Sequence, residues 1–346
     1  MLQAVLIAVP PRKRQATREP ARVAVRQRLG RLSDLRVTAR TFNRYVRSAA
    51  RFLEWAQQAG HGGLAADDAA LEHQLCEYIE ELWQEGEGRS AATDVMSSVC
   101  FLLKRPRSFH AGWRLCSTWA RLELPCRAPP LTQDLLLAMC GYACSIGRSD
   151  IACGMCLGFH CLLRTGELAG VCVEHVNLSP LRTGVLALPL TKSGQRRGAQ
   201  EIVTVDDSCV GALVAALMAR SRSGKLMPGV TSRTLCDFFR ESAEQLGISS
   251  LNLRPYSIRR GGATHDFLVH GSVQKTILRG RWSDLKVARI YITDGLAVQS
   301  QFAVAAAARE RCRHYSRIFA LHVQSLAATA RPSARAAAAV PLLDAC

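Results

Sequence analysis

The sequence lacks several features that define whole classes of protein. It contains no run of about 18 apolar residues, which excludes a membrane-spanning helix on length. We find no glycine-rich phosphate-binding loop and no internal repeat with a period of about 20 to 50 residues. The apolar stretch Leu2–Val9 is short, has no basic region before it and runs directly into Pro10, so we expect a protein that is not secreted.

Cysteine is abundant, but its arrangement lacks what a disulfide framework or a zinc site requires. Most of the 14 cysteines fall inside apolar stretches with helical character, so we expect buried, reduced thiols. Cys153 and Cys156 form a single CxxC pair. A structural zinc ion needs four ligands, and no second pair is suitably placed, so we expect no metal.

Basic residues are present in large excess and are concentrated near the start of the chain. The formal charge is +17, and residues 1–51 contain 13 basic residues against two acidic ones. A net charge of +11 therefore lies in this segment, and the remainder is only mildly basic. Such a balance indicates a polyanionic partner, either nucleic acid or an anionic membrane surface.

The length of 346 residues, of which 48% are hydrophobic, predicts two domains. Residues 1–37 are rich in arginine and lack a durable apolar period, so we interpret them as a basic extension without stable structure. Three prolines between residues 123 and 132 favour a linker, because they remove backbone donors and disfavour helix. The predicted parts are then a helical domain at 38–124, a second domain at 131–298, and a C-terminal helix with an alanine-rich tail at 299–346.

Hydrophobic periodicity predicts a mainly α protein with one small β element. Residues 184–192 and 201–206 are rich in branched side chains and flank a polar stretch, which is typical of a β-hairpin. Helices are expected at about residues 71–85, 90–103, 109–122, 133–144 and 150–163.

The first predicted helix of the N-terminal domain is amphipathic, with one basic face. Apolar residues recur at helical spacing from Phe42 to Trp55, and arginines occupy the other side. We expect this basic face to contact DNA through Arg40, Arg44, Arg47 and Arg51.

Two segments of the second domain carry cations suited to a phosphodiester site. Arg164 is followed three residues later by Glu167, so its guanidinium group can grip phosphate oxygens while the carboxylate orients it. The alternative is a surface pair of little energetic worth. Lys192 lies at the mouth of the predicted hairpin and can protonate a departing 5′-oxygen. The alternative is an exposed lysine that only aids solubility.

Two further segments supply arginines and a phenol. Arg259 and Arg260 follow Pro255, which fits the first turn of a helix, and can clamp a phosphate or merely position DNA. Trp282 precedes Tyr291 by nine residues, a spacing that can place both side chains in one pocket. A phenol with a pKa near 10 attacks phosphorus only when neighbouring cations activate it, and otherwise Tyr291 is a core residue.

Taken together, the segments between residues 131 and 296 resemble the catalytic domain of tyrosine recombinases, the phage-integrase family. That family has an arginine with a trailing acid, a hairpin lysine, a box arginine followed by Ala-Thr, a Gly-His or Gly-Trp step and a tyrosine nine residues later. Tyr256 stands where the family has the first histidine of the box, and Arg260 stands where a second histidine often follows. The positions that match the pattern in order are Arg164, Glu167, Lys192, Arg259, Trp282 and Tyr291.

The resemblance implies DNA strand cleavage and rejoining through a 3′-phosphotyrosyl bond to Tyr291, as in site-specific recombination and DNA integration. It implies double-stranded DNA as the partner, a homotetramer on DNA, and neither cofactor nor metal. Residues 38–122 would be the core DNA-binding domain, and residues after 299 would pack on a neighbouring protomer through Phe302, Ala306 and Cys312. The compartment would be the nucleus in a eukaryote and the cytoplasm or nucleoid in a prokaryote.

Two alternative functions stay open at this point. A recombinase-derived protein that binds DNA without catalysis is favoured by Tyr256, because a tyrosine is a weaker proton shuttle than histidine near pH 7. A type IB topoisomerase-like enzyme would use similar tyrosine chemistry and relax supercoils as a monomer.

Overall fold

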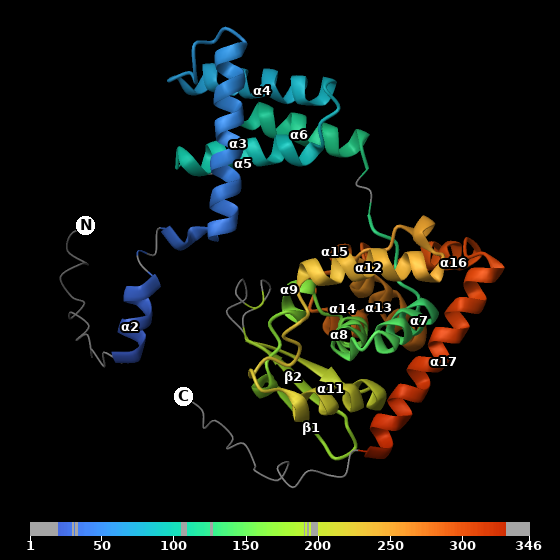
Figure 1. The fold of residues 1–346 in the computed structure, drawn as a ribbon. Coiled ribbons are helices and arrows are strands. Elements are labelled where there is room, and N and C mark those ends of the chain that lie inside the picture. Colours follow the sequence, from blue (N-terminus) through green and yellow to red (C-terminus); the bar gives the residue numbers. More distant parts are fainter. Residues whose placement is uncertain are drawn as a thin grey trace. The chain divides into compact units, whose positions relative to one another are not determined.

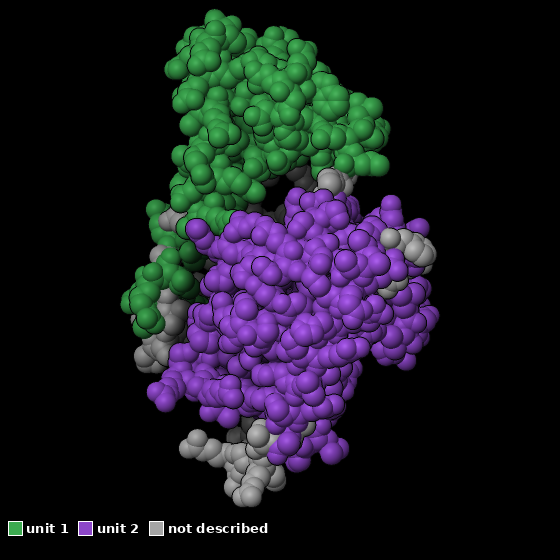
Figure 2. Space-filling model, turned by 45° about the vertical axis from the view of Figure 1, so that its right-hand side comes forward, with its two compact units in different colours: residues 1–126 green, residues 127–346 purple. Residues whose placement is uncertain are grey.

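The computed structural model describes residues 20–29, 31, 34–104, 109–124, 127–189, 191, 194 and 200–329. The chain divides into two compact units, residues 1–126 and 127–346, which Figure 2 colours separately. The division falls inside the proline-containing segment that we interpreted as a linker. Within the described residues, no helix is both long and apolar enough to cross a membrane.

The first unit is helical, as the periodicity predicts, and its four main helices pack around one core (Figure 1). Phe52 from the first of these helices is fully buried against Leu75, Ile79 and Met96 from the next two. Thr38 caps the first helix by accepting a hydrogen bond from the backbone N–H of Thr41. The helices are α3 (Ala39–Gln58), α4 (Asp68–Gln84), α5 (Arg89–Leu102) and α6 (His110–Leu122).

The structure differs from our expectation within residues 1–37. Helix α2 spans Pro20–Leu29, and a 3₁₀ turn spans Asp34–Arg36, inside the segment predicted to lack stable structure. Proline at the first helical position fixes a helical φ angle and loses no helical hydrogen bond, which favours a helix start here. Its apolar residues show no sustained helical period, which concealed this helix from an analysis of periodicity. Residues 1–19 lie outside the described part of the chain.

The second unit combines helices with a small antiparallel sheet of order β1-β2-β3 (Figure 1). The predicted hairpin is confirmed, with Val185 paired to Thr204. The first strand was not predicted, because three residues are too few to show an alternating pattern. The strands are β1 (Val176–Leu178), β2 (Gly184–Leu188) and β3 (Glu201–Val205), and the helices are α7 (Gln133–Ser145), α8 (Ser149–His160), α9 (Thr165–Leu168), α11 (Ser208–Arg220), α12 (Ser232–Leu246), α13 (Pro255–His270), α14 (Val273–Gly280), α15 (Leu285–Arg289), α16 (Asp294–Phe302) and α17 (Ala306–Thr329).

Helices α7, α8 and α13 form the centre of the second unit. The cysteines of α7 and α8 are free thiols and most are buried, as expected for small apolar residues in a helical core. Helix α13 approaches α8 closely because Gly262 faces the carbonyl group of Phe159, where a side chain would overlap the backbone. This close approach brings the end of α8 next to the first turns of α13.

The C-terminal helix α17 packs along α7 of its own unit. Cys312 is buried there together with Val304, Ala308 and Phe319, so it belongs to the core of its own protomer. This corrects the interpretation of Cys312 as an anchor on a neighbour. Ala306 is exposed, and the side chain of Phe302 is outside the described residues.

The contact between α7 and α17 predicts the effect of one added methyl group. A Cβ atom on Gly141 would overlap the carbonyl oxygen of Tyr315 in α17, so we expect Gly141→Ala to lower the free energy of unfolding by about 1 to 3 kcal/mol in urea titrations. Gly295→Ala in α16 is the matched control, because its Cβ atom would meet open space. Equal stability of the two variants would contradict this packing.

Candidate active site

A buried arginine stands at the centre of the site. Arg259 lies on α13, its side chain is 1% exposed, and it donates hydrogen bonds to the carbonyl oxygens of Leu162 and Gly280, the latter over 2.6 Å. These carbonyl groups belong to the turn after α8 and to the end of α14. A planar guanidinium group can hold two acceptors at a fixed angle, and Arg259 therefore joins the two segments.

Two aromatic rings cover this guanidinium group. Trp282 and Tyr291 are stacked with ring centroids 4.6 Å apart, and the Cζ atom of Arg259 lies 5.2 Å and 5.4 Å from the two centroids. The ring of Tyr256 lies 5.7 Å from that of Tyr291. Thr264 donates a hydrogen bond to the carbonyl oxygen of Tyr291 over 3.2 Å. The residues singled out on α13 and around α15 thus meet at one place.

Arg164 reaches the same cluster through Glu167. The residue lies just before α9, where its guanidinium group contacts a carboxylate oxygen of Glu167 at 2.6 Å. The other oxygen of this carboxylate lies 3.9 Å from a guanidinium nitrogen of Arg259. The side chain of Glu167 is buried, whereas that of Arg164 is one-third exposed.

Two residues that the sequence analysis did not single out complete the cluster. Arg281 is buried, contacts Glu167 at 2.7 Å, and lies 3.2 Å from a carboxylate oxygen of Glu201. Glu201 also accepts a hydrogen bond from Thr191 over 2.6 Å. In the sequence, Arg281 lies between Gly280 and Trp282, and this position beside a predicted site residue was the only indication that it belongs to the site. Glu201 opens strand β3 and shares its buried face with Val203 and Val205, so strand alternation was an available signal for its burial.

Burial of this cluster changes the acid–base properties of its members. Burial first, and then the charges of Arg164 and Arg281, lower the pKa of Arg259 to about 10, so this group is a cation at neutral pH. Burial also lowers the pKa of Arg281. Partial burial, followed by a hydrogen bond with the Tyr291 phenol, raises the pKa of Tyr256. Tyr256 therefore keeps its proton well above neutral pH and acts as a hydrogen-bond donor.

Buried donors without a hydrogen-bond acceptor in the described cluster include Nε of Arg259 and Nε1 of Trp282. An unsatisfied buried donor costs about 1 to 3 kcal/mol, so an anionic oxygen that reached both atoms would be bound favourably. The arrangement can hold an oxyanion beside the phenol of Tyr291.

Of two other predicted site residues, one makes its hydrogen bonds elsewhere and the other is outside the described residues. Arg260 is buried and directed away from the Arg259 cluster, because it donates to the carbonyl oxygen of Ala128 and lies 3.4 Å from the hydroxyl oxygen of Thr293. It thus links the start of the second unit to the chain just after Tyr291. Lys192 lies outside the described residues, although Thr191 immediately before it is held by Glu201.

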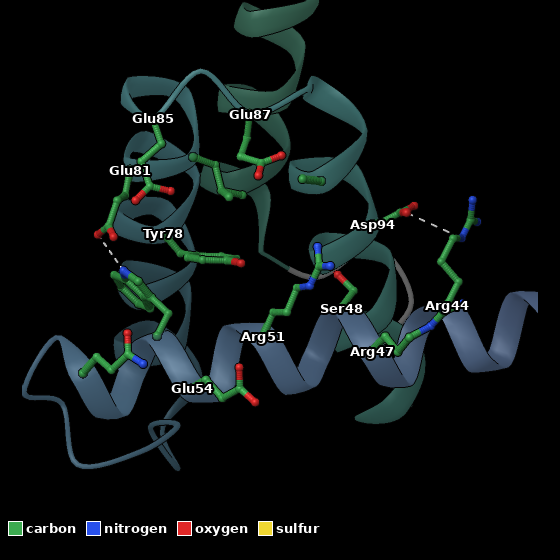
Figure 3. A pocket seen from close by; sticks show the side chains of 14 residues that line it. Arg44, Arg47, Ser48, Arg51, Glu54, Tyr78, Glu81, Glu85, Glu87 and Asp94 are labelled. Atoms are coloured by element: carbon green, nitrogen blue, oxygen red, sulfur yellow. Dashed lines mark hydrogen bonds and ion pairs between the residues drawn. The ribbon is translucent and has the colours of Figure 1, made fainter.

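The basic face of α3 borders a groove of about 590 Å³ in the first unit (Figure 3). Three arginines line the groove, but five carboxylates line it as well, so the groove itself is not basic. Arg44 lies 3.5 Å from Asp94, and Arg47 donates to a carbonyl group of its own helix. Arg40 does not line the groove, and its side chain is exposed. The four arginines therefore differ in how far their charge is already compensated.

One group among the described residues has side chains of metal-ligand type. Cys172, Glu174 and His175 place their ligand atoms within 4.8 Å of one another. The backbone N–H of Cys172, however, donates to Nδ1 of His175 over 3.2 Å, so the neutral ring carries its proton on Nε2. Both ring nitrogens are thus engaged in a way that does not favour a metal ion.

The bonds of Arg259 predict a stability effect that differs from that of a surface arginine. Lysine has one ammonium group and cannot bridge the carbonyl groups of Leu162 and Gly280, so Arg259→Lys should lower the free energy of unfolding by about 2 kcal/mol in urea titrations. Arg240→Lys, at an exposed pair with Asp237, should change it by less than about 0.5 kcal/mol. Similar losses in both variants would disprove the bridging role.

No family model and no curated protein matches this sequence. Solved structures do match. XerH site-specific recombinase bound to a palindromic difH substrate matches with TM-score 0.52 and 11% identity over 75% of this chain and 78% of that chain. A variant of the Tn1549 transposon integrase in complex with circular intermediate DNA matches with TM-score 0.51 and 11% identity over 76% of this chain and 99% of that chain. A lambda integrase dimer bound to a core site matches with TM-score 0.50 and 13% identity over 85% of each chain. At this identity the likeness concerns the fold alone, and the chain has the tyrosine recombinase and integrase fold.

Proposed function

We propose that this protein cuts and rejoins double-stranded DNA through a covalent bond to Tyr291. The observation that carries the proposal is the stacking of the Tyr291 and Trp282 rings over the guanidinium group of Arg259. Nε of Arg259 and Nε1 of Trp282, which are buried donors without acceptors, together with the one-third exposed Arg164, supply a site for a phosphate beside this phenol. The structural neighbours that carry DNA are recombinases and integrases, which supports the same class of reaction here.

The proposed step is a transesterification. The Tyr291 oxygen attacks phosphorus and gives its proton to solvent water, the bond from phosphorus to the 5′-oxygen breaks, and Lys192 gives a proton to that oxygen. Arg164 and Arg259 hold the non-bridging oxygens as negative charge develops. The 3′-phosphotyrosyl bond conserves the energy of the broken bond, so attack by a 5′-hydroxyl group rejoins the strand without an energy-supplying cofactor.

The remaining residues have supporting parts in this proposal. Tyr256 donates a hydrogen bond to the phosphate from the position that a histidine holds in related sequences, since its raised pKa keeps it protonated. The arginines of α3 contact the DNA backbone and set orientation rather than sequence. Strand exchange between two duplexes requires several protomers, and we propose a homotetramer on DNA.

The covalent step gives a direct test. Duplexes of random sequence that carry one 5′-bridging phosphorothiolate trap the adduct, because the departing thiol rejoins the strand poorly. We expect the full-length protein to form a DNA adduct that survives denaturing electrophoresis, and Tyr291→Phe to form none while it still retains DNA on filters. An adduct of undiminished yield with Tyr291→Phe would contradict the assignment of the nucleophile.

A second candidate function, DNA binding without cleavage, is favoured by one residue, Tyr256. A protonated phenol with a raised pKa does not accept protons near neutral pH, and a protein that has lost proton transfer would bind DNA without cleaving it. In that case the random duplexes would be retained in a salt-sensitive manner, and sequencing of the denatured sample would recover no covalently attached strand.

The partial compensation of the α3 arginines predicts unequal contributions to DNA binding. Arg40→Gln should reduce the slope of log K against log salt by about 0.9, because one phosphate contact is lost. Arg44→Gln, which removes a charge already paired with Asp94, should change this slope by about half as much or less. Filter binding between low and moderate salt measures both, and a larger effect of Arg44→Gln would argue against the described pairing.

A further inference from the structure

Arg281 occupies a backbone position that usually requires glycine. It follows α14 with a φ of 54°, in the left-handed region, where a side chain other than glycine costs roughly 1 to 2 kcal/mol. The side chain is nevertheless long, charged and buried. The left-handed backbone and the burial of a charge both cost free energy, so the contacts of Arg281 must offset these two costs.

The contacts of Arg281 join two elements that are far apart in the sequence. One guanidinium nitrogen contacts Glu167 beside α9, and another lies near Glu201 at the start of β3. Glu201 in turn accepts a hydrogen bond from Thr191, and the backbone N–H of Gly194 donates to the hydroxyl oxygen of Thr191. Arg281 thus supports both the arginine cluster and the end of the strand that leads to Lys192.

The charges show why this support matters for a phosphate site. Glu167 contacts both phosphate-binding arginines, and Glu201 is a second buried carboxylate in the same cluster. Removal of Arg281 would leave the described cluster without net positive charge, because two arginines would face two glutamates. With Arg281 the net charge is +1, from Arg164, Arg259, Arg281, Glu167 and Glu201.

We propose that Arg281 is a positioning residue that neutralises the carboxylates of Glu167 and Glu201, so that these carboxylates do not cancel the positive charge with which Arg164 and Arg259 hold a DNA phosphate. Arg281 itself does not touch the reacting atoms. The inference rests on the proposed function, since its effect is expressed in the covalent step.

A charge-rescue experiment tests this role. The probe is the phosphorothiolate duplex most enriched by the wild-type protein, and the rate of adduct formation is measured against DNA concentration. Arg281→Gly suits the left-handed backbone, and it should slow the rate at saturating DNA at least about tenfold, with a smaller change in half-saturating concentration. Addition of Glu201→Gln should restore the rate to within about threefold of wild type, because glutamine removes the charge and still accepts from Thr191.

Two controls separate this role from general destabilisation. Arg279→Lys weakens a comparable ion pair with Asp206 that touches neither Glu167 nor Glu201, and it should leave the rate per folded molecule unchanged. If Arg281→Gly shows no cooperative unfolding, Arg281→Asn with and without Glu201→Gln gives the same comparison, because asparagine is neutral and tolerates the left-handed backbone.

Each outcome decides the inference. A rate for Arg281→Gly within twofold of wild type, or a failure of Glu201→Gln to rescue it, would overturn the positioning role while the proposed function stands. Absence of any adduct with the wild-type protein would overturn the proposed function, and the role of Arg281 with it.

Discussion

The second unit depends on the burial of one cation, the guanidinium group of Arg259. It holds the carbonyl group of Leu162 after α8 and that of Gly280 at the end of α14, and it carries two stacked aromatic rings on its face. Burial of a charge is costly, and here two carbonyl groups and the nearby carboxylate of Glu167 offset part of that cost. The interactions that hold these loops together therefore also place the residues of the proposed phosphate site.

Much of the architecture could be predicted because it follows from the hydrophobic pattern. The helices α4 to α8 lie where apolar residues have helical spacing. The hairpin was predicted from two stretches of branched residues that flank a polar stretch. The strand β1 and the helix α2 were not foreseen. The strand is too short to show a period, and the apolar residues of the helix do not recur at a sustained helical spacing.

The candidate site also contains residues that could be predicted from the sequence and residues that could not. Arg164, Arg259, Trp282 and Tyr291 were found because their residue types and spacing match a known pattern, and the structure describes each of them in or beside one cluster. Arg281 was missed because its burial depends on long-range packing. Glu201 was missed because apolar residues stand on both faces of its strand, so the sequence did not show which face is buried. Arg260 was expected beside Arg259, but adjacent residues of a helix point in directions about 100° apart, and it faces Ala128 and Thr293 instead.

The position of α17 also affects how the molecule is made. This helix covers α7, and its Cys312 and Phe319 complete the core that surrounds α8 and α13. During synthesis, that core stays incomplete until residues 306–329 have emerged from the ribosome. A nascent chain would therefore hold the residues of the candidate site on an incomplete core, and assembly of this site would wait for α17.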